Sequence, residues 1–141
     1  MTTPPTSVLF VCVHNSGKSQ IAAAIARHEF PHVHVASAGT APSDTVHPGS
    51  AATLAEVGID ITGEEPKPIT DDLVAAADLV VVLGTEAQLT TSDGTPVMRW
   101  EVDEPSARGI EGVDRMRLVR EDIAARVRGL LGERAGQEVG R

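Results

Sequence analysis

Residues 8–27 read VLFVCVHNSGKSQIAAAIAR, and this stretch decides how the rest of the chain is organised. Its first part, Val8 to Val11, is an unbroken apolar run typical of a strand buried on both faces. Small and polar residues follow, and from Ser19 onward the apolar residues recur at helical spacing without glycine or proline. A strand, a tight loop and a helix N-terminus together favour an anion, because unpaired amides and the helix dipole both attract negative charge. The stretch therefore predicts an oxyanion-binding loop.

The only cysteine of the chain, Cys12, stands at the first position of this loop. A helix N-terminus and the neighbouring Lys18 favour the thiolate, which is the nucleophilic form of a cysteine. Ser19 is placed to donate to the thiolate or to help it leave, and Gly17 lets the backbone approach an anion closely. Asn15 tolerates left-handed backbone angles and can tie the loop with its amide. A lone cysteine is more often buried and inert, so the prediction of a nucleophile depends on the loop and helix that follow.

The spacing of Cys12, five further residues, a basic residue and Ser19 resembles the C-x5-R-S loop of low-molecular-weight protein tyrosine phosphatases. The chain is equally similar to the arsenate reductases that share their fold, and it most resembles the single-cysteine arsenate–mycothiol transferases. The similarity extends to about Leu131 through four landmarks: Ser37-Ala38-Gly39-Thr40, His47-Pro48, Gly58-Ile59-Asp60 and Lys67-Pro68-Ile69-Thr70. The resemblance implies that Cys12, Lys18 and Ser19 are catalytic. The oxyanion is then held by Val13, His14, Asn15, Ser16, Gly17 and Lys18.

Lys18 departs from the family pattern, since most members carry arginine there. A guanidinium grips two oxygens in a fixed fork, whereas an ammonium acts as a point charge. The lysine therefore weakens the expectation of efficient phosphoester cleavage more than the expectation of oxyanion binding. Gly17-Lys18-Ser19 also matches the end of a nucleotide-binding P-loop, but Cys12 stands where that motif has its first glycine. The later apolar run Leu79 to Leu83 ends without the acidic residue that a magnesium site requires.

A second chemical group is needed, because the oxygen that departs when Cys12 attacks must receive a proton. In the resembled family an aspartate supplies this proton, usually just before a proline on a late loop after the fourth strand. Residues 100–105 read WEVDEP, so Glu104 occupies the position before Pro105, while Asp103 matches the residue type. The resemblance implies that one of these two carboxyl groups is the general acid, and both remain candidates. Each is also compatible with an exposed turn.

Length, charge and composition limit the classes of function. With 141 residues, of which 41% are apolar, the chain is long enough for one domain with its own core. A net charge of −8 argues against nucleic acid and anionic membrane as partners, so local amides and Lys18 must attract the anion. No apolar run is long enough to span a membrane. The absence of an export signal and of a second cysteine predicts the cytoplasm.

The apolar runs and helix signals predict an α/β fold in a single domain over residues 1–141, with 1–6 and 133–141 flexible. The expected strands are residues 7–11, 32–36, 78–83 and 96–102. The expected helices are residues 17–29, 48–57, 70–77 and 110–131, with a helical turn at 86–89. Alternating strands and helices imply a three-layer sandwich, in which a four-stranded parallel sheet carries helices on both faces. The most apolar strand, 78–83, suits the centre and the alternating 32–36 suits an edge.

The last helix is expected to be amphipathic, with an apolar core stripe opposite arginines. The stripe is predicted to consist of Val113, Met116, Val119, Ile123, Val127 and Leu130. The arginines are interpreted as a solvated face with pairs to Glu111, Asp114 and Glu121; they are Arg108, Arg115, Arg117 and Arg120. Of these, Arg108 is close enough to the acid loop to be an exception. His28, His32 and His34 lack a fixed ligand spacing, so no metal site is predicted.

Two reactions use a nucleophilic cysteine in such a loop. A phosphatase forms a phospho-cysteine that water hydrolyses, whereas an arsenate reductase forms a cysteine–arsenate adduct and needs a second thiol for electrons. Because the chain has no second cysteine, reduction requires an external thiol, either mycothiol or glutathione, with its redoxin system. No bound cofactor is expected. The preferred prediction is thiol-dependent arsenate reduction. The alternatives are a phosphatase for phosphotyrosine or small phosphoesters, and a catalytically weak oxyanion-binding protein.

Overall fold

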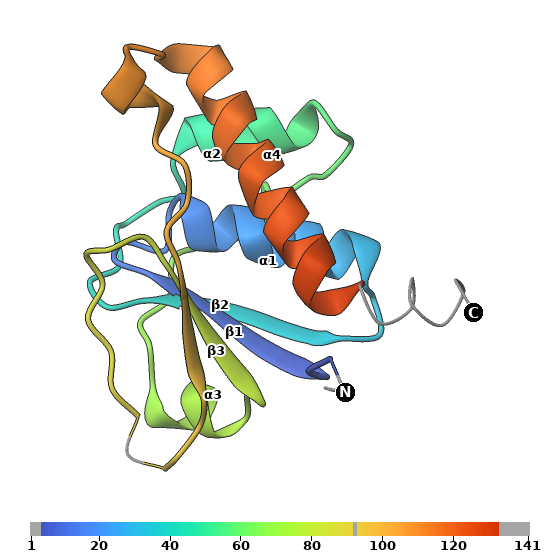
Figure 1. Ribbon diagram of the computed structural model, residues 1–141, viewed down its shortest axis with the longest axis vertical. Coiled ribbons are helices and arrows are strands. Elements are labelled where there is room, and N and C mark those ends of the chain that lie inside the picture. Colours follow the sequence, from blue (N-terminus) through green and yellow to red (C-terminus); the bar gives the residue numbers. More distant parts are fainter. Residues whose placement is uncertain (1–3, 92, 133–141) are drawn as a thin grey trace.

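A computed structural model describes residues 4–91 and 93–132 and places a four-stranded parallel sheet at their centre (Figure 1). The strands are β1 (Ser7–Cys12), β2 (His34–Gly39), β3 (Leu79–Leu83) and β4 (Val97–Trp100). Their order across the sheet is β2-β1-β3-β4, and every pairing is parallel. The predicted sheet is confirmed, with the 79–83 run inside it and the second strand at an edge.

Helices cover both faces of this sheet, as expected for the three-layer sandwich. They are α1 (Lys18–Glu29), α2 (Pro48–Ala55), α3 (Asp71–Ala75) and α4 (Gly112–Leu131), together with the 3-10 helix η1 (Pro105–Arg108). Side chains alternate along a strand, so Phe10 and Val81 join the larger core with α1 and α4, whereas Leu9 and Val80 pack on the α3 side. Figure 1 shows α1, α2 and α4 on one side of the sheet and α3 on the other. Within the described ranges, no helix has the length and apolar character needed to cross a membrane.

Several element boundaries differ from the predictions because tertiary pairing outweighs local pattern. β2 runs on to Gly39, since Ser37 to Gly39 pair with the end of β1. The expected turn at 86–89 is not helical. In α4, Val113 is 60% exposed because it lies in the first turn, outside the apolar cluster. Leu130 is partly buried against that cluster, and Leu131, which was not predicted, is buried in it. Thr6, in the segment expected to be flexible, donates two hydrogen bonds to Asp78; residues 1–3 and 133–141 lie outside the described residues.

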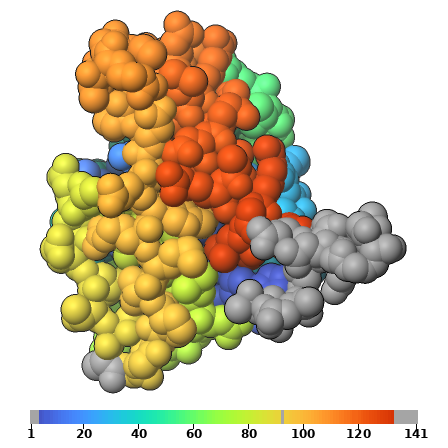
Figure 2. Space-filling view, in the orientation of Figure 1, coloured from blue at the N-terminus to red at the C-terminus, as the bar shows by residue number. Residues whose placement is uncertain are grey.

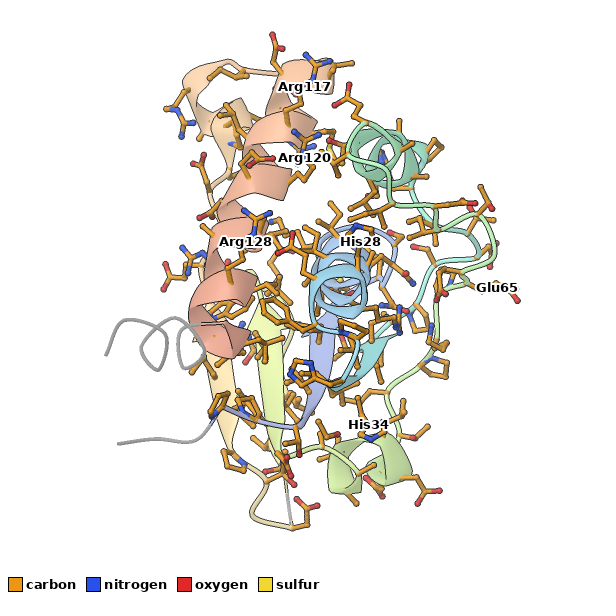
Figure 3. The ribbon with its side chains drawn as sticks, turned by 90° about the vertical axis from the view of Figure 1, so that its right-hand side faces the viewer. His28, His34, Glu65, Arg117, Arg120 and Arg128 are labelled. Carbon is orange, nitrogen blue, oxygen red and sulfur yellow. The ribbon has the colours of Figure 1, made fainter. Side chains whose placement is uncertain are left out.

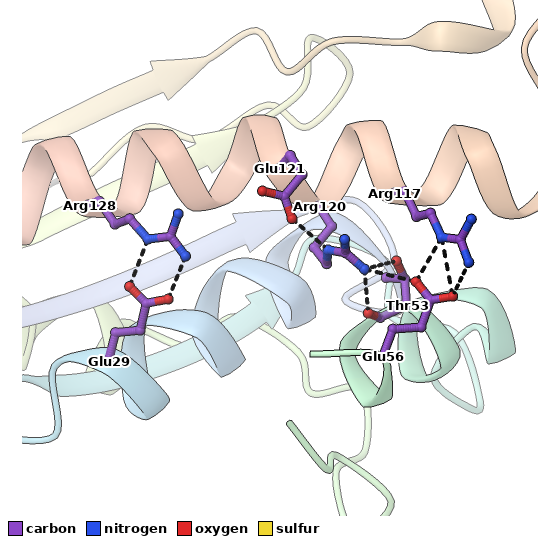
Figure 4. Close-up of polar contacts among 7 residues, drawn as sticks. All are labelled: Glu29, Thr53, Glu56, Arg117, Arg120, Glu121 and Arg128. Atoms are coloured by element: carbon purple, nitrogen blue, oxygen red, sulfur yellow. Dashed lines mark hydrogen bonds and ion pairs between the residues drawn. The ribbon is translucent and has the colours of Figure 1, made fainter. Parts of the chain in front are cut away.

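The long helix α4 closes one side of the molecule, and its turns occupy much of the face seen in Figure 2. Its apolar side contributes Val119, Ile123 and Val127 to the larger core. Near its end, Arg128 donates from Nε and Nη2 to the two carboxylate oxygens of Glu29 on α1, over 2.8 and 2.7 Å. This fork holds the end of α4 against α1 (Figure 4).

Two further arginines join α4 to α2, as Figures 3 and 4 show. Arg117 donates from Nη2 to Glu56 over 2.6 Å, and Arg120 donates to the same carboxylate over 3.0 Å. The Arg120 side chain is only 11% exposed and also donates to the carbonyl oxygen of Thr53. The prediction of a solvated arginine face was wrong for Arg120, which is largely buried against α2, whereas the Arg117 side chain is 50% exposed. The expected contact of Arg120 with Glu121 is present at 2.9 Å. A looser Arg117–Asp114 contact at 3.7 Å follows the expected spacing.

Candidate active site

A cleft of about 620 Å³ opens beyond the carboxyl ends of the strands, where a parallel sheet is expected to bind its ligand. Its walls come from the loop of residues 12–18 (the Cys12 loop), from α2, from the segments after β3 and β4, and from the first turns of α4. Cys12 ends β1, is 9% exposed and contributes to the lining. The predicted nucleophile therefore reaches an open space rather than being enclosed by packed aliphatic side chains.

The backbone of the Cys12 loop is anchored through its carbonyl groups. These groups accept hydrogen bonds of 2.7 to 3.1 Å from amides of segment 40–47; they belong to Cys12, Val13, His14 and Ser16. Within the part of the chain that the structure describes, the amides of residues 13–17 donate no hydrogen bond. Gly17 is the N-cap of α1, and no side chain caps this helix start. The loop amides thus remain available to an oxyanion, as the motif predicts.

A hydroxyl lies directly against the cysteine sulfur. The distance between Ser19 Oγ and Cys12 Sγ is 2.9 Å, and Asn15 Nδ2 donates to the same Oγ over 2.7 Å. Since Ser19 accepts from the Asn15 amide, its own proton is free to point toward the sulfur. The predicted neighbours Ser19 and Cys12 are thus in contact, and the assistance of the serine to the cysteine stays a prediction.

Asn15 supports the loop from behind instead of lining the cleft. It is fully buried and adopts φ +51°, the left-handed conformation that its residue type tolerates. Its Oδ1 accepts from the Lys67 amide over 2.9 Å and from Gln20 Nε2 over 3.2 Å. Gln20 Nε2 also lies 3.4 Å from the carbonyl oxygen of Glu65. The segment 65–67 therefore supports the Cys12 loop, a role that the sequence analysis did not predict.

The structure separates the two candidate acids. Glu104 lines the cleft, and Arg115 donates to its two oxygens from Nε and Nη2, over 2.8 and 3.1 Å. Asp103 is not among the lining residues; Arg108 forks its carboxylate over 2.7 and 3.1 Å. Ser106 Oγ adds a hydrogen bond of 2.8 Å to Glu104. The carboxyl group available to a ligand near Cys12 is therefore that of Glu104.

Cations keep Glu104 ionised. Hydrogen bonds from Arg115 and Ser106, with the charges of Arg115 and Lys18, lower the pKa of Glu104 from 4.5 to about 2. Lys18 Nζ lies 3.6 Å from Glu104 Oε1. A group with this pKa is a carboxylate at neutral pH, the opposite of the state that a general acid requires. The fork from Arg108 likewise holds the pKa of Asp103 below its ordinary value.

The sequence interpretation missed several lining residues. Arg115 was expected on a solvated face but lies in the cleft, because η1 returns the chain so that the first turn of α4 faces Glu104. His47 and Ser50 of the α2 start also line the cleft, and only the His47-Pro48 landmark pointed there. In the described ranges, no group of three or more His, Cys, Asp or Glu side chains is arranged to hold a metal ion.

Residues 7–141 match the family described as low molecular weight phosphotyrosine protein phosphatase, and the chain belongs to this family. A solved thioredoxin-dependent arsenate reductase of Corynebacterium glutamicum is similar, with 37% identity and a TM-score of 0.74 over 92% of this chain. The present chain spans 62% of that longer one. A solved arsenate reductase in the phosphate binding state has 30% identity and a TM-score of 0.75, covering 91% of this chain and 98% of that one. A glutaredoxin arsenate reductase of Synechocystis is 32% identical over 130 residues, covering 89% of this chain and 96% of that protein.

Proposed function

We propose that this protein is a thiol-dependent arsenate reductase in which Cys12 attacks arsenate and an external thiol completes the reaction. The observation that supports this most is the placement of a single cysteine at an open cleft, beside five loop amides without a partner among the described residues. A tetrahedral oxyanion fits such a ring of donors. The relatives whose names specify arsenate reduction, at 30 to 37% identity, favour arsenate as that oxyanion.

In the proposed first step, the thiolate of Cys12 forms an S–As bond while one As–O bond breaks. The departing oxygen leaves as water after it has taken up a proton. The amides of residues 13–17 and the ammonium of Lys18 hold the remaining oxygens, so that charge developing on them meets fixed donors. Ser19, 2.9 Å from the sulfur, donates to the thiolate before the attack.

Electrons then come from an external thiol, since the sequence contains one cysteine. In one route the thiol attacks Cys12 Sγ, an S–S bond forms, and the electron pair of the S–As bond leaves with arsenic as arsenite. A second thiol or a redoxin then reduces the mixed disulfide. In the other route, the transferase type, the external thiol attacks arsenic, a new S–As bond forms and the bond to Cys12 breaks, which returns the Cys12 thiolate. A redoxin thiol then attacks the sulfur of the released adduct, an S–S bond forms, and the electron pair of that S–As bond leaves with arsenic as arsenite. Mycothiol and glutathione are the candidate thiols, and the thioredoxin- and glutaredoxin-linked names of two relatives favour a redoxin partner.

The second candidate function is a phosphatase for phosphotyrosine or small phosphoesters, which the description of the matching family favours. The same thiolate would form a phospho-cysteine, and water would release phosphate. This reaction needs no external thiol, so the two candidates differ in a single requirement that can be measured directly.

The test is arsenate turnover with mycothiol, with glutathione and with neither, in parallel with phosphate release from an aryl phosphate. Arsenite formed only with a thiol, and lost in Cys12→Ser, supports the proposal. Ser43→Ala is a matched control, because Ser43 touches the Cys12 loop through its backbone amide and this hydroxyl-to-methyl change leaves that contact in place. Phosphate release without thiol supports the second candidate. Oxyanion binding with neither activity would contradict both and indicate a catalytically weak binding protein.

A further inference from the structure

Arg115 is the least expected member of the cleft. Its guanidinium uses Nε and Nη2 to fork Glu104, while Nη1 lies 3.5 Å from Met116 Sδ. The other polar contacts of Glu104 come from Ser106 Oγ and, more loosely, from Lys18 Nζ at 3.6 Å. Every one of these neighbours is a donor to the carboxylate. The arrangement stabilises the ionised form of Glu104, the carboxyl group that the sequence proposes as proton donor and that also lines the cleft.

The two candidate substrates differ in their need for that proton. When Cys12 attacks a phosphoester, the S–P bond forms, the P–O bond breaks, and the electron pair leaves on an alkoxide or phenoxide. The phosphoester dianion carries no proton to give, so that oxygen must gain one from the protein unless it is stable as an anion. When Cys12 attacks arsenate, the departing oxygen is a hydroxyl. Dihydrogen arsenate, a major species near neutral pH, carries a second proton that can move to this hydroxyl, which leaves as water.

We propose that Arg115 is a specificity-determining residue, which disfavours phosphoesters by withholding from the cleft the proton donor that their leaving groups need. This inference rests on the proposed arsenate reductase function and assigns the choice of substrate at that site. Arg115 acts through Glu104 and is a positioning residue, whereas Cys12 remains the group that touches the substrate. The wild-type protein should cleave only phosphoesters whose leaving groups are stable as anions.

The expected effect can be bounded from the charge state of Glu104. If loss of the Arg115 fork returned its pKa from about 2 to 4.5, the protonated fraction near pH 6 would rise about 300-fold. Solvent screening reduces this gain, because the Glu104 side chain is 39% exposed and Lys18 stays nearby. We therefore expect an increase of about tenfold or more in the cleavage of esters with poor leaving groups.

The chain contains a matched control for this change. Arg108 donates two hydrogen bonds to the Asp103 carboxylate, as Arg115 does to that of Glu104, but Asp103 does not line the cleft. The experiment compares wild type, Arg115→Met, Arg115→Lys and Arg108→Met near pH 6. For each, kcat/KM is measured on 2,4-dinitrophenyl phosphate and on phenyl phosphate, and the ratio of the two values is taken. Thermal unfolding of each variant checks that it is folded.

The ratio should be high in wild type and in Arg108→Met, about tenfold or more lower in Arg115→Met, and intermediate in Arg115→Lys, which keeps the charge without the fork. Adding Glu104→Gln to Arg115→Met should restore the high ratio. The inference is overturned if the ratio in Arg115→Met equals that of wild type, or if folded Arg115 variants do not cleave phenyl phosphate. It is also overturned if Arg108→Met shows the same change, or if the ratio stays low after Glu104→Gln is added to Arg115→Met.

Arsenite formation by the same variants separates this inference from the proposed function. If wild type reduces arsenate with a thiol but the ester ratio does not respond to Arg115, the inference fails and the proposed function stands. If the ratio responds as expected but no thiol supports arsenate reduction, the proposed function fails, and Arg115 controls proton donation in a phosphatase instead.

Discussion

Replacing Asn15 by alanine tests whether one buried side chain holds the Cys12 loop in its reactive shape. The asparagine donates to Ser19 Oγ and accepts from the Lys67 amide and from Gln20 Nε2. Alanine removes these hydrogen bonds but must still adopt the backbone conformation at φ +51° that the loop requires. The substitution therefore combines a loss of hydrogen bonds with backbone strain. The contribution of each to the free energy of unfolding can be estimated separately.

The Lys67 amide, which is part-buried, loses its acceptor; an unpaired buried donor costs ~1–3 kcal/mol, and partial exposure places this amide in the lower half of that range. A non-glycine residue other than asparagine or aspartate adds ~1 kcal/mol in the left-handed region. Asn15→Ala should thus lower the free energy of unfolding by about 3 kcal/mol, a large share of the ~5–15 kcal/mol typical of a domain. Asn15→Gly loses the same hydrogen bonds without the strain, so its loss should be smaller by about 1 kcal/mol.

Urea unfolding of wild type and both variants gives these free energies, and alkylation of Cys12 by iodoacetamide reports the state of the sulfur. Without Asn15, Ser19 loses the donor that orients its hydroxyl, so the alkylation rate near neutral pH should change in both variants. Unfolding free energies within about 0.5 kcal/mol of wild type, the range of ordinary surface substitutions, would refute the reasoning. Equal losses in the alanine and glycine variants would refute the assignment of backbone strain.

The remaining predictions concern the glycine next to the Cys12 loop and the two ion pairs of Glu56. At Gly39 an added Cβ would lie 2.6 Å from Val13 O and 3.0 Å from Asn15 N, so Gly39→Ala should displace the Cys12 loop and abolish most turnover. Gly129→Ala, where nothing lies within 4 Å, is the control and should stabilise α4 by about 0.5–1 kcal/mol; full activity in Gly39→Ala would contradict the close approach. Hydrogen bonds from Arg117, with those from Arg120, lower the pKa of Glu56 from 4.5 to about 2. A depressed folded-state pKa stabilises the fold above pH 4.5, and the benefit is lost as the pH falls toward 2. Glu56→Gln should therefore be less stable than wild type at neutral pH, and its free energy of unfolding should depend less on pH between 4.5 and 2. If urea unfolding at several pH values gives the same pH dependence for Glu56→Gln and wild type, the pairing is contradicted.

What the sequence predicts well is local. The strand, the Cys12 loop and the start of α1 are contiguous, so their residue types alone indicate an oxyanion loop. The supports of that loop are not local: the Lys67 amide reaches Asn15 across 52 residues. Such a contact leaves no mark in composition or periodicity. The resemblance marked Lys67-Pro68-Ile69-Thr70 as a landmark but did not indicate that this segment supports the Cys12 loop.

The acid loop illustrates a different limit. Sequence reasoning narrowed the choice to Asp103 and Glu104 but could not choose, because adjacent residues in a turn point in different directions. The structure places Glu104, directly before η1, in the lining of the cleft and leaves Asp103 outside that lining. Arg115 was misassigned for a related reason. Helical periodicity shows which residues share a face of a helix but not what that face meets.

The charged residues that line the cleft determine which groups can attract an entering oxyanion. Lys18 and Arg115 are its cationic lining residues other than histidine, and both already contact Glu104, while Glu86 and Glu101 add negative charge. An entering dianion thus competes with Glu104 for Lys18, and the contact at 3.6 Å is the weaker of the two because it has no fork geometry. The Arg115 fork, with two hydrogen bonds to Glu104, is the harder of the two contacts for an entering anion to displace. With a net charge of −8 on the chain, the attraction that remains comes chiefly from the loop amides and the start of α1, which carry no titratable charge.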